Sequence, residues 1–262
     1  MNSDLIISRS GDTYFFALNR PERGNGLSAS LVEAFHVGLD ELEHANGRML
    51  LIRGEGRNFC TGFDLDGITA MTDADLLWRF VRIEQLFARL WDAPYSTVAV
   101  GKGRVFGAGA DLFAACRQRL ALPDATFSFP GAAFGLVLGT RRLCVRVGEA
   151  AAEHLVASGA VVNAEAALRL GLATAMLDSA DLEAAVENEI AVSNRLDPVT
   201  YKAVRTAVGA DAWRLDADLA ALVRSAVRPG LGQRIIEYRA LAIEAHRSGA
   251  PKVKHYWISE GK

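Results

Sequence analysis

Residues 103–112, GRVFGAGADL, join a predicted strand to a predicted helix through a glycine-rich turn. The strand, residues 97–100 (TVAV), is apolar throughout, and the helix is expected over residues 110–119. Such a turn leaves backbone N–H groups unpaired at the start of the helix, where the helix dipole is positive. Its small residues allow a ligand carbonyl to approach the backbone closely. The segment therefore indicates either a binding turn or tight packing of a strand against a helix.

A second glycine-containing turn, NFCTGFDL at residues 58–65, follows another predicted strand at residues 49–53. Two N–H groups that converge on one oxygen atom form an oxyanion hole, in which the loss of one donor costs about 3–4 kcal/mol. Neither turn is specific by itself. Their pairing, their order and the segments around them carry the functional argument.

The remaining chain alternates strands with helices up to about residue 190. Short strands are predicted at residues 5–8, 13–18 and 127–129, and helices are expected after the capping residue Ser28 and over residues 73–91. This alternation favours a parallel sheet with helical crossovers. Strand signals then vanish, and helices are predicted at residues 198–208, 215–227 and 232–246. We therefore expect an α/β core over residues 1–190 and a C-terminal helical subdomain over residues 191–262.

Composition excludes several classes of function. The chain has 262 residues, 50% of them hydrophobic, and a formal net charge of −2, which argues against a nucleic-acid-binding protein. Its three cysteines and five scattered histidines predict neither a disulfide framework nor a metal site. No apolar run is long enough to cross a membrane, and the N-terminus does not look like a signal peptide. We expect a cytoplasmic protein.

Taken together, these segments resemble the crotonase (enoyl-CoA hydratase/isomerase) superfamily over roughly residues 5–180. The matching phrases are LNRPE at 18–22, FCTGFDL at 59–65, the turn at 103–112, FSFP at 127–130, GTRRL at 139–143 and AEAALRLGL at 164–172. The resemblance implies a spiral core of repeated ββα units and a helical region that forms trimers or dimers of trimers. It also implies a CoA ester bound in a bent form as substrate, with no separate cofactor.

The resemblance assigns roles to individual residues. The oxyanion donors correspond to the N–H groups of Phe63 and Ala108, although Ala108 stands where the family usually has glycine. The first hydratase glutamate corresponds to Asp111, which could act as base or acid, or could merely complement the start of a helix. The second glutamate would follow Pro130, but that position is Gly131. Two-glutamate hydration is therefore not expected.

Further candidates come from other segments. Glu84 matches a position at which some family members carry an active-site histidine, and it could equally lie on a solvated helix face beside Arg79 and Arg82. Lys252 and Lys254 offer late phosphate contacts. The other predicted contacts with CoA are Arg23, Gly62, Asp64, Leu65 and Gly107.

The expected function is that of an acyl-CoA enzyme that stabilises a thioester oxyanion or enolate. One carboxylate can shuttle one proton, so isomerase-like proton transfer is favoured over hydration. Hydrolysis and decarboxylation stay open. The alternative is a catalytically weak or inactive homologue that binds CoA esters.

Overall fold

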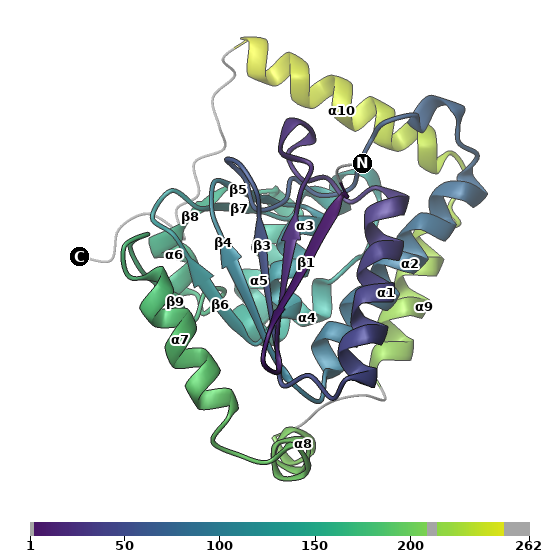
Figure 1. The fold of residues 1–262 in the computed structure, drawn as a ribbon. Coiled ribbons are helices and arrows are strands. Elements are labelled where there is room, and N and C mark those ends of the chain that lie inside the picture. The colour runs from purple at the N-terminus through teal and green to yellow at the C-terminus, as the bar shows by residue number, and fades with distance from the viewer. Residues whose placement is uncertain (1–2, 209–213, 249–262) are drawn as a thin grey trace.

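The computed structural model describes residues 3–208 and 214–248, which form a mixed α/β fold (Figure 1). The strands are β1 (Leu5–Ser10), β2 (Thr13–Leu18), β3 (Met49–Gly54), β4 (Ser96–Gly101), β5 (Arg104–Phe106), β6 (Gln118–Ala121), β7 (Thr126–Ser128), β8 (Val162–Asn163) and β9 (Ala175–Met176). The helices are α1 (Ala29–His44), α2 (Asp73–Asp92), α3 (Ala108–Ala115), α4 (Thr140–Val147), α5 (Glu149–Ser158), α6 (Ala164–Arg169), α7 (Leu182–Ser193), α8 (Pro198–Ala207), α9 (Leu215–Ala226) and α10 (Leu231–Ser248). Three short 3-10 helices are η1 (Pro21–Arg23), η2 (Ile68–Ala70) and η3 (Pro130–Phe134).

Two sheets organise the chain. The larger has the order β1-β2-β3-β4-β6-β9, and the smaller has the order β5-β7-β8. The β1–β2 hairpin is antiparallel, whereas β2, β3, β4, β6 and β9 pair in parallel. Each parallel pair needs a crossover, which the intervening helices supply. The predicted parallel sheet is confirmed.

Alternating side chains bury both faces of the large sheet. On β3, Leu50 and Ile52 belong to the main core with residues of α1, α2 and α3. Met49 and Leu51 belong to a second cluster on the opposite face, which is covered by residues of α7. In Figure 1, α1 and α2 accordingly lie on one side of the sheet and α7 on the other. Because both faces are covered there, the central strands β3 and β4 are buried along almost their whole length rather than on alternate residues.

Local capping explains where the long helices begin. The Ser28 side chain accepts a hydrogen bond from the backbone N–H of Leu31 and caps α1, as predicted. Thr72 and Asp75 form a reciprocal capping box at the start of α2. The helix predicted over residues 110–119 is wrong at its end. It stops at Ala115, and residues 118–121 (QRLA) form β6, which pairs with β4. The pairing with β4, which local sequence does not show, sets this boundary.

The C-terminal helices return to the core. Residues of α2, α9 and α10 form one small apolar cluster. This cluster includes Phe80, Leu136, Leu222 and Ile235. The division of the chain at residue 190 stays a prediction, and Lys252 and Lys254 lie outside the described residues. Among the helices of residues 3–208 and 214–248, none is long and apolar enough to span a bilayer.

Candidate functional site

The first predicted oxyanion donor lies on a short bridge between two loops. The Leu27 N–H donates to the carbonyl of Gly62 at 2.7 Å, and the Asp64 N–H donates to the carbonyl of Leu27 at 3.2 Å. Because successive N–H groups along an extended segment point in opposite directions, the N–H of Phe63 points away from Leu27. It donates to no acceptor within the described residues.

The second donor lies at the start of α3. Gly107 takes a positive φ of 53° at the N-cap, and its own N–H donates to the carbonyl of Ser128 at 2.8 Å. Ala108 then begins the helix, and its N–H has no acceptor in the described chain. The positive φ falls on Gly107, whereas Ala108 has helical backbone and no positive φ, so alanine is compatible with position 108.

The two turns lie in direct contact. A Cβ atom at Gly62 would lie 2.8 Å from the carbonyl oxygen of Phe106 and 3.3 Å from the nitrogen of Ala108, and Gly62 itself has a φ of 103°. A Cβ atom at Gly109 would lie 2.3 Å from the carbonyl oxygen of Cys60. Glycine is therefore required at both positions, because a side chain at either one would push the two turns apart.

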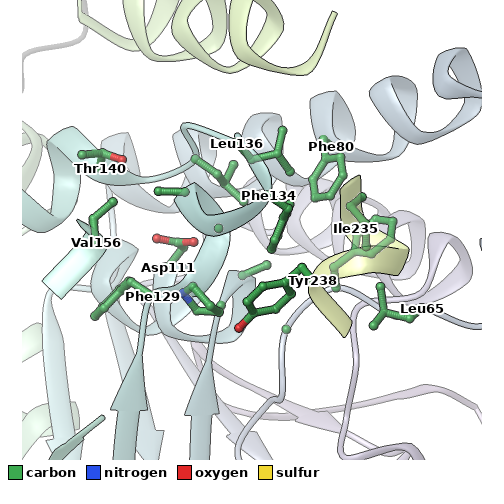
Figure 2. A pocket seen from close by; sticks show the side chains of 18 of the residues that line it. Leu65, Phe80, Asp111, Phe129, Phe134, Leu136, Thr140, Val156, Ile235 and Tyr238 are labelled. Atoms are coloured by element: carbon green, nitrogen blue, oxygen red, sulfur yellow. The ribbon is translucent and has the colours of Figure 1, made fainter. Parts of the chain in front are cut away.

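A cavity of about 130 Å³ lies beside these turns (Figure 2). It is lined mainly by apolar side chains, together with Asp111, Gly131 and Tyr238. Phe63 forms part of one wall, where its ring stacks on Phe80 with the centroids 4.4 Å apart. The cavity has the features of a small-molecule site, which is concave, largely apolar and supplied with few polar groups.

Asp111 contributes the carboxyl group of this cavity. It is 6% exposed and accepts no hydrogen bond from the described residues. Burial raises the pKa of Asp111 well above its usual range; the Arg142 guanidinium opposes this rise and the Glu84 carboxylate adds to it. The backbone approaches closely at Gly139, where a Cβ atom would lie 2.1 Å from Asp111 Oδ1. The site therefore holds a carboxyl group that binds its proton unusually strongly.

Glu84 does not line the cavity. It is 1% exposed and forms a two-point ion pair with Arg142, with oxygen–nitrogen distances of 2.7 and 2.6 Å. Arg142 also lies 3.3 Å from Asp218 of α9, which pairs with Arg141 at 2.7 Å. The alternative of a solvated helix face is wrong for Glu84, because the residue is buried. Its predicted catalytic role stays a prediction, and its contacts favour a structural role.

Gly131 lines the cavity in η3, at the place where the resemblance implies a second glutamate. Only the carbonyl oxygen of Leu136, at 3.7 Å, would meet a Cβ atom there. The position is therefore open, and no carboxylate occupies it. The cavity also receives Ile235 and Tyr238 from α10. The sequence did not identify these two residues. The spacing of apolar residues predicts a helix, but it does not show which cavity one side of that helix will line.

The predicted contacts with CoA separate into two groups. Gly62, Leu65 and Gly107 line the cavity. Asp64 instead accepts a hydrogen bond from Arg20 at 2.7 Å, and Arg23 makes an exposed ion pair with Asp66 at 3.3 Å. The pKa of Asp64 is lowered because its hydrogen bonds with the Asp66 N–H and Arg20 outweigh its burial.

Comparison with known proteins gives the family. The model of the enoyl-CoA hydratase/isomerase family matches residues 13–223. A protein of Mycobacterium tuberculosis named as an enoyl-CoA hydratase is 33% identical over 170 residues, covering 64% of this chain and 68% of the relative. An ethylmalonyl-CoA decarboxylase of Gallus gallus is 31% identical over 175 residues. The match covers 65% of this chain and 59% of the relative.

A solved structure from Bordetella parapertussis, described as an enoyl-CoA hydratase/isomerase, superposes with a TM-score of 0.89. The two sequences are 41% identical, and the superposition covers 91% of this chain and 99% of the Bordetella chain. Both glycine-containing turns, Asp111 and Gly131 fall within the matched residues of the family model. The chain therefore belongs to the enoyl-CoA hydratase/isomerase family.

Proposed function

We propose that this enzyme stabilises the enolate of an acyl-CoA thioester and moves one proton through Asp111, as an isomerase does. The observation that carries the proposal is the pairing of one buried carboxyl group with two free N–H groups at the same cavity. Gly131 supplies no second carboxylate. A hydratase that uses two acid–base groups would lack one of them here.

The proposed reaction begins with a 3-enoyl-CoA whose thioester oxygen accepts hydrogen bonds from the Phe63 and Ala108 N–H groups. The Asp111 carboxylate removes a proton from the carbon next to the thioester carbonyl, and the C–H electron pair enters the enolate. The two N–H donors stabilise the negative charge on oxygen. Asp111 returns the same proton to the γ-carbon, which moves the double bond by one position. Its raised pKa makes it a stronger base than an ordinary carboxylate.

Decarboxylation is the second candidate function. Loss of CO₂ from a 2-carboxyacyl-CoA leaves the electron pair of the broken C–C bond in a thioester enolate, whose α-carbon then needs a proton donor rather than a base. A raised pKa favours the protonated form of Asp111, which suits that task. The similarity to an ethylmalonyl-CoA decarboxylase adds support.

A substrate panel distinguishes these functions. The wild-type enzyme and Asp111→Asn are each given a 3-enoyl-CoA, a dienoyl-CoA, crotonyl-CoA and an alkylmalonyl-CoA, and products are separated by chromatography. We expect isomerisation of the 3-enoyl-CoA and slow hydration of crotonyl-CoA. CO₂ release without isomerisation would favour the second candidate. Binding of every ester with no turnover would favour an inactive homologue, and rapid hydration would overturn the proposal.

A further inference from the structure

The far wall of the cavity closes the space available to an acyl group. This wall is formed by rings and branched side chains from α2, η3 and α10: Phe80, Phe134, Leu136, Ile235 and Tyr238. The rings of Phe134 and Tyr238 lie 5.3 Å apart, which is contact distance for an aromatic pair. Figure 2 shows these side chains on the side of the cavity away from Thr140 and Val156.

Hydrogen bonds hold α10 against this wall. Arg234 Nε donates to the carbonyl oxygen of Phe134 at 3.0 Å, which joins α10 to η3. The Asp73 carboxylate at the start of α2 accepts from the N–H groups of Gly230 and Gly232 at 2.8 and 2.9 Å. Charge-assisted bonds of this kind are stronger than neutral ones. The start of α10 is therefore attached to both elements that line the wall with it.

Apolar packing behind the wall limits its ability to yield. Phe80, Leu136 and Ile235 are each 2% exposed and share a cluster with Leu76 and Leu222. Interiors packed in this way deform little, so a longer acyl chain would have to displace core side chains. The wall therefore acts as a fixed limit on acyl length.

Cavity volume sets the size of the acyl group. An engineered apolar cavity of about 150 Å³ in another protein holds one benzene molecule, which has six carbon atoms. The present cavity of about 130 Å³ is close to that size. We propose that the enzyme acts on compact acyl-CoA esters, with an acyl group of about four to six carbons or one aromatic ring, and excludes long-chain fatty acyl groups. This inference rests on the proposed function, in which the cavity holds the acyl thioester.

The test is a calorimetric titration of the wild-type protein with acetyl-, butanoyl-, hexanoyl-, benzoyl-, decanoyl- and hexadecanoyl-CoA. We expect tightest binding among the butanoyl, hexanoyl and benzoyl esters, and at least about tenfold weaker binding of the decanoyl ester. Decanoyl-CoA that binds as tightly as butanoyl-CoA would overturn the size limit while leaving the proposed function intact. Failure of every ester to bind would overturn the proposed function itself.

A substitution in the far wall tests whether this wall limits the length of the acyl group. Phe134 is only half-buried, so Phe134→Ala removes the ring at moderate cost to the fold. We expect the ratio of the Kd for decanoyl-CoA to the Kd for butanoyl-CoA to fall at least about tenfold in this variant. The matched control is Phe15→Ala, which removes a half-buried ring on the α7 face of the large sheet. An equal gain in the control, or no gain in Phe134→Ala, would overturn the role of this wall.

Discussion

At the scale of single residues, Asp111 should determine turnover. Asp111→Asn keeps the volume of the side chain but removes the base, so kcat should fall at least about 10²-fold while acyl-CoA affinity changes little. In the wild type the acid limb of kcat/KM should lie well above the ordinary pKa of a carboxyl group, because burial raises the pKa of Asp111. Steady-state kinetics across pH would check both statements. Full activity in the Asn variant would reduce Asp111 to a helix-start residue.

The raised pKa of Asp111 also predicts that Asp111→Asn stabilises the folded protein against unfolding. Between the ordinary value of 3.8 and its raised value, the folded protein keeps a proton that the unfolded chain has released. The wild type should therefore lose stability as pH rises through that interval. Asparagine does not titrate, so the advantage of Asp111→Asn in melting temperature should grow from pH 4 towards neutrality. Thermal unfolding at several pH values measures this, and a constant or shrinking difference would contradict it.

Gly131 offers a position for building the missing acid–base group. Its φ is not in the left-handed region, and a Cβ atom would meet only the Leu136 carbonyl oxygen at 3.7 Å. Gly131→Glu should raise crotonyl-CoA hydration by about 10²-fold, the contribution of one positioned acid–base group. Gly131→Gln is the matched control, because it has the same length and no acid. Equal rates in the two variants would show that the carboxylate does not reach the substrate.

Much of this site could be predicted from local sequence, because each turn places its own donor. The family resemblance of these segments singled out Phe63, Ala108, Asp111 and Gly131, and all four line one cavity. Tyr238 could not be predicted there, since it reaches the cavity through the packing of α10 on η3. The Glu84–Arg142 pair likewise joins residues 58 positions apart, on helices whose relative position depends on the whole fold.

At the scale of elements, the Glu84–Arg142 pair should hold α2 to α4. Both side chains are almost fully buried, so Glu84→Gln leaves Asp218, at 3.3 Å, as the remaining ion-pair partner of Arg142 among the described residues. Breaking a buried pair in this way typically costs about 3–5 kcal/mol, which denaturant unfolding would measure. The acid limb of the pH profile should also move to lower pH, because the Glu84 charge raises the pKa of Asp111.

Glu33→Gln is the control for this pair. Glu33 of α1 bonds Arg82 at 2.7 Å, but its side chain is 53% exposed, so the loss should stay within about 1 kcal/mol. A catalytic Glu84 would behave differently. It would lose kcat on substitution with stability unchanged, and that result would contradict the structural role.

Elements also show where sequence patterns are ambiguous. The strands β2 and β3 were predicted nearly to their ends, since each is an apolar run bounded by turn residues. The boundary between α3 and β6 was not predicted, because no glycine or proline separates the helix from residues 118–121. The chain changes from helix to strand there so that β6 can pair with β4 and then with β9. Tertiary pairing, rather than local propensity, determines that boundary.

At the scale of the whole molecule, the C-terminal helices expose apolar side chains that a single copy leaves uncovered. Val199 of α8 is 78% exposed, and Leu241 of α10 is 66% exposed. Figure 1 shows α8 and α10 projecting from opposite ends of the sheet. Apolar residues gathered on projecting helices are typical of surfaces that associate. We therefore predict that copies of the chain associate, and the family resemblance implies a trimer or a dimer of trimers.

Light scattering would measure the assembly, with an expected mass three or six times that of one chain. Val199→Glu and Leu241→Glu place a charge on the predicted contacts without touching the core, so each should weaken association. Glu165→Gln serves as the control, because it changes the charge of an exposed side chain on α6, away from α8 and α10. A dissociated variant that still binds butanoyl-CoA would mean that one copy completes the cavity. A wild-type protein that is monomeric at micromolar concentration would contradict the prediction, and binding lost together with assembly would mean that a neighbouring copy completes the site.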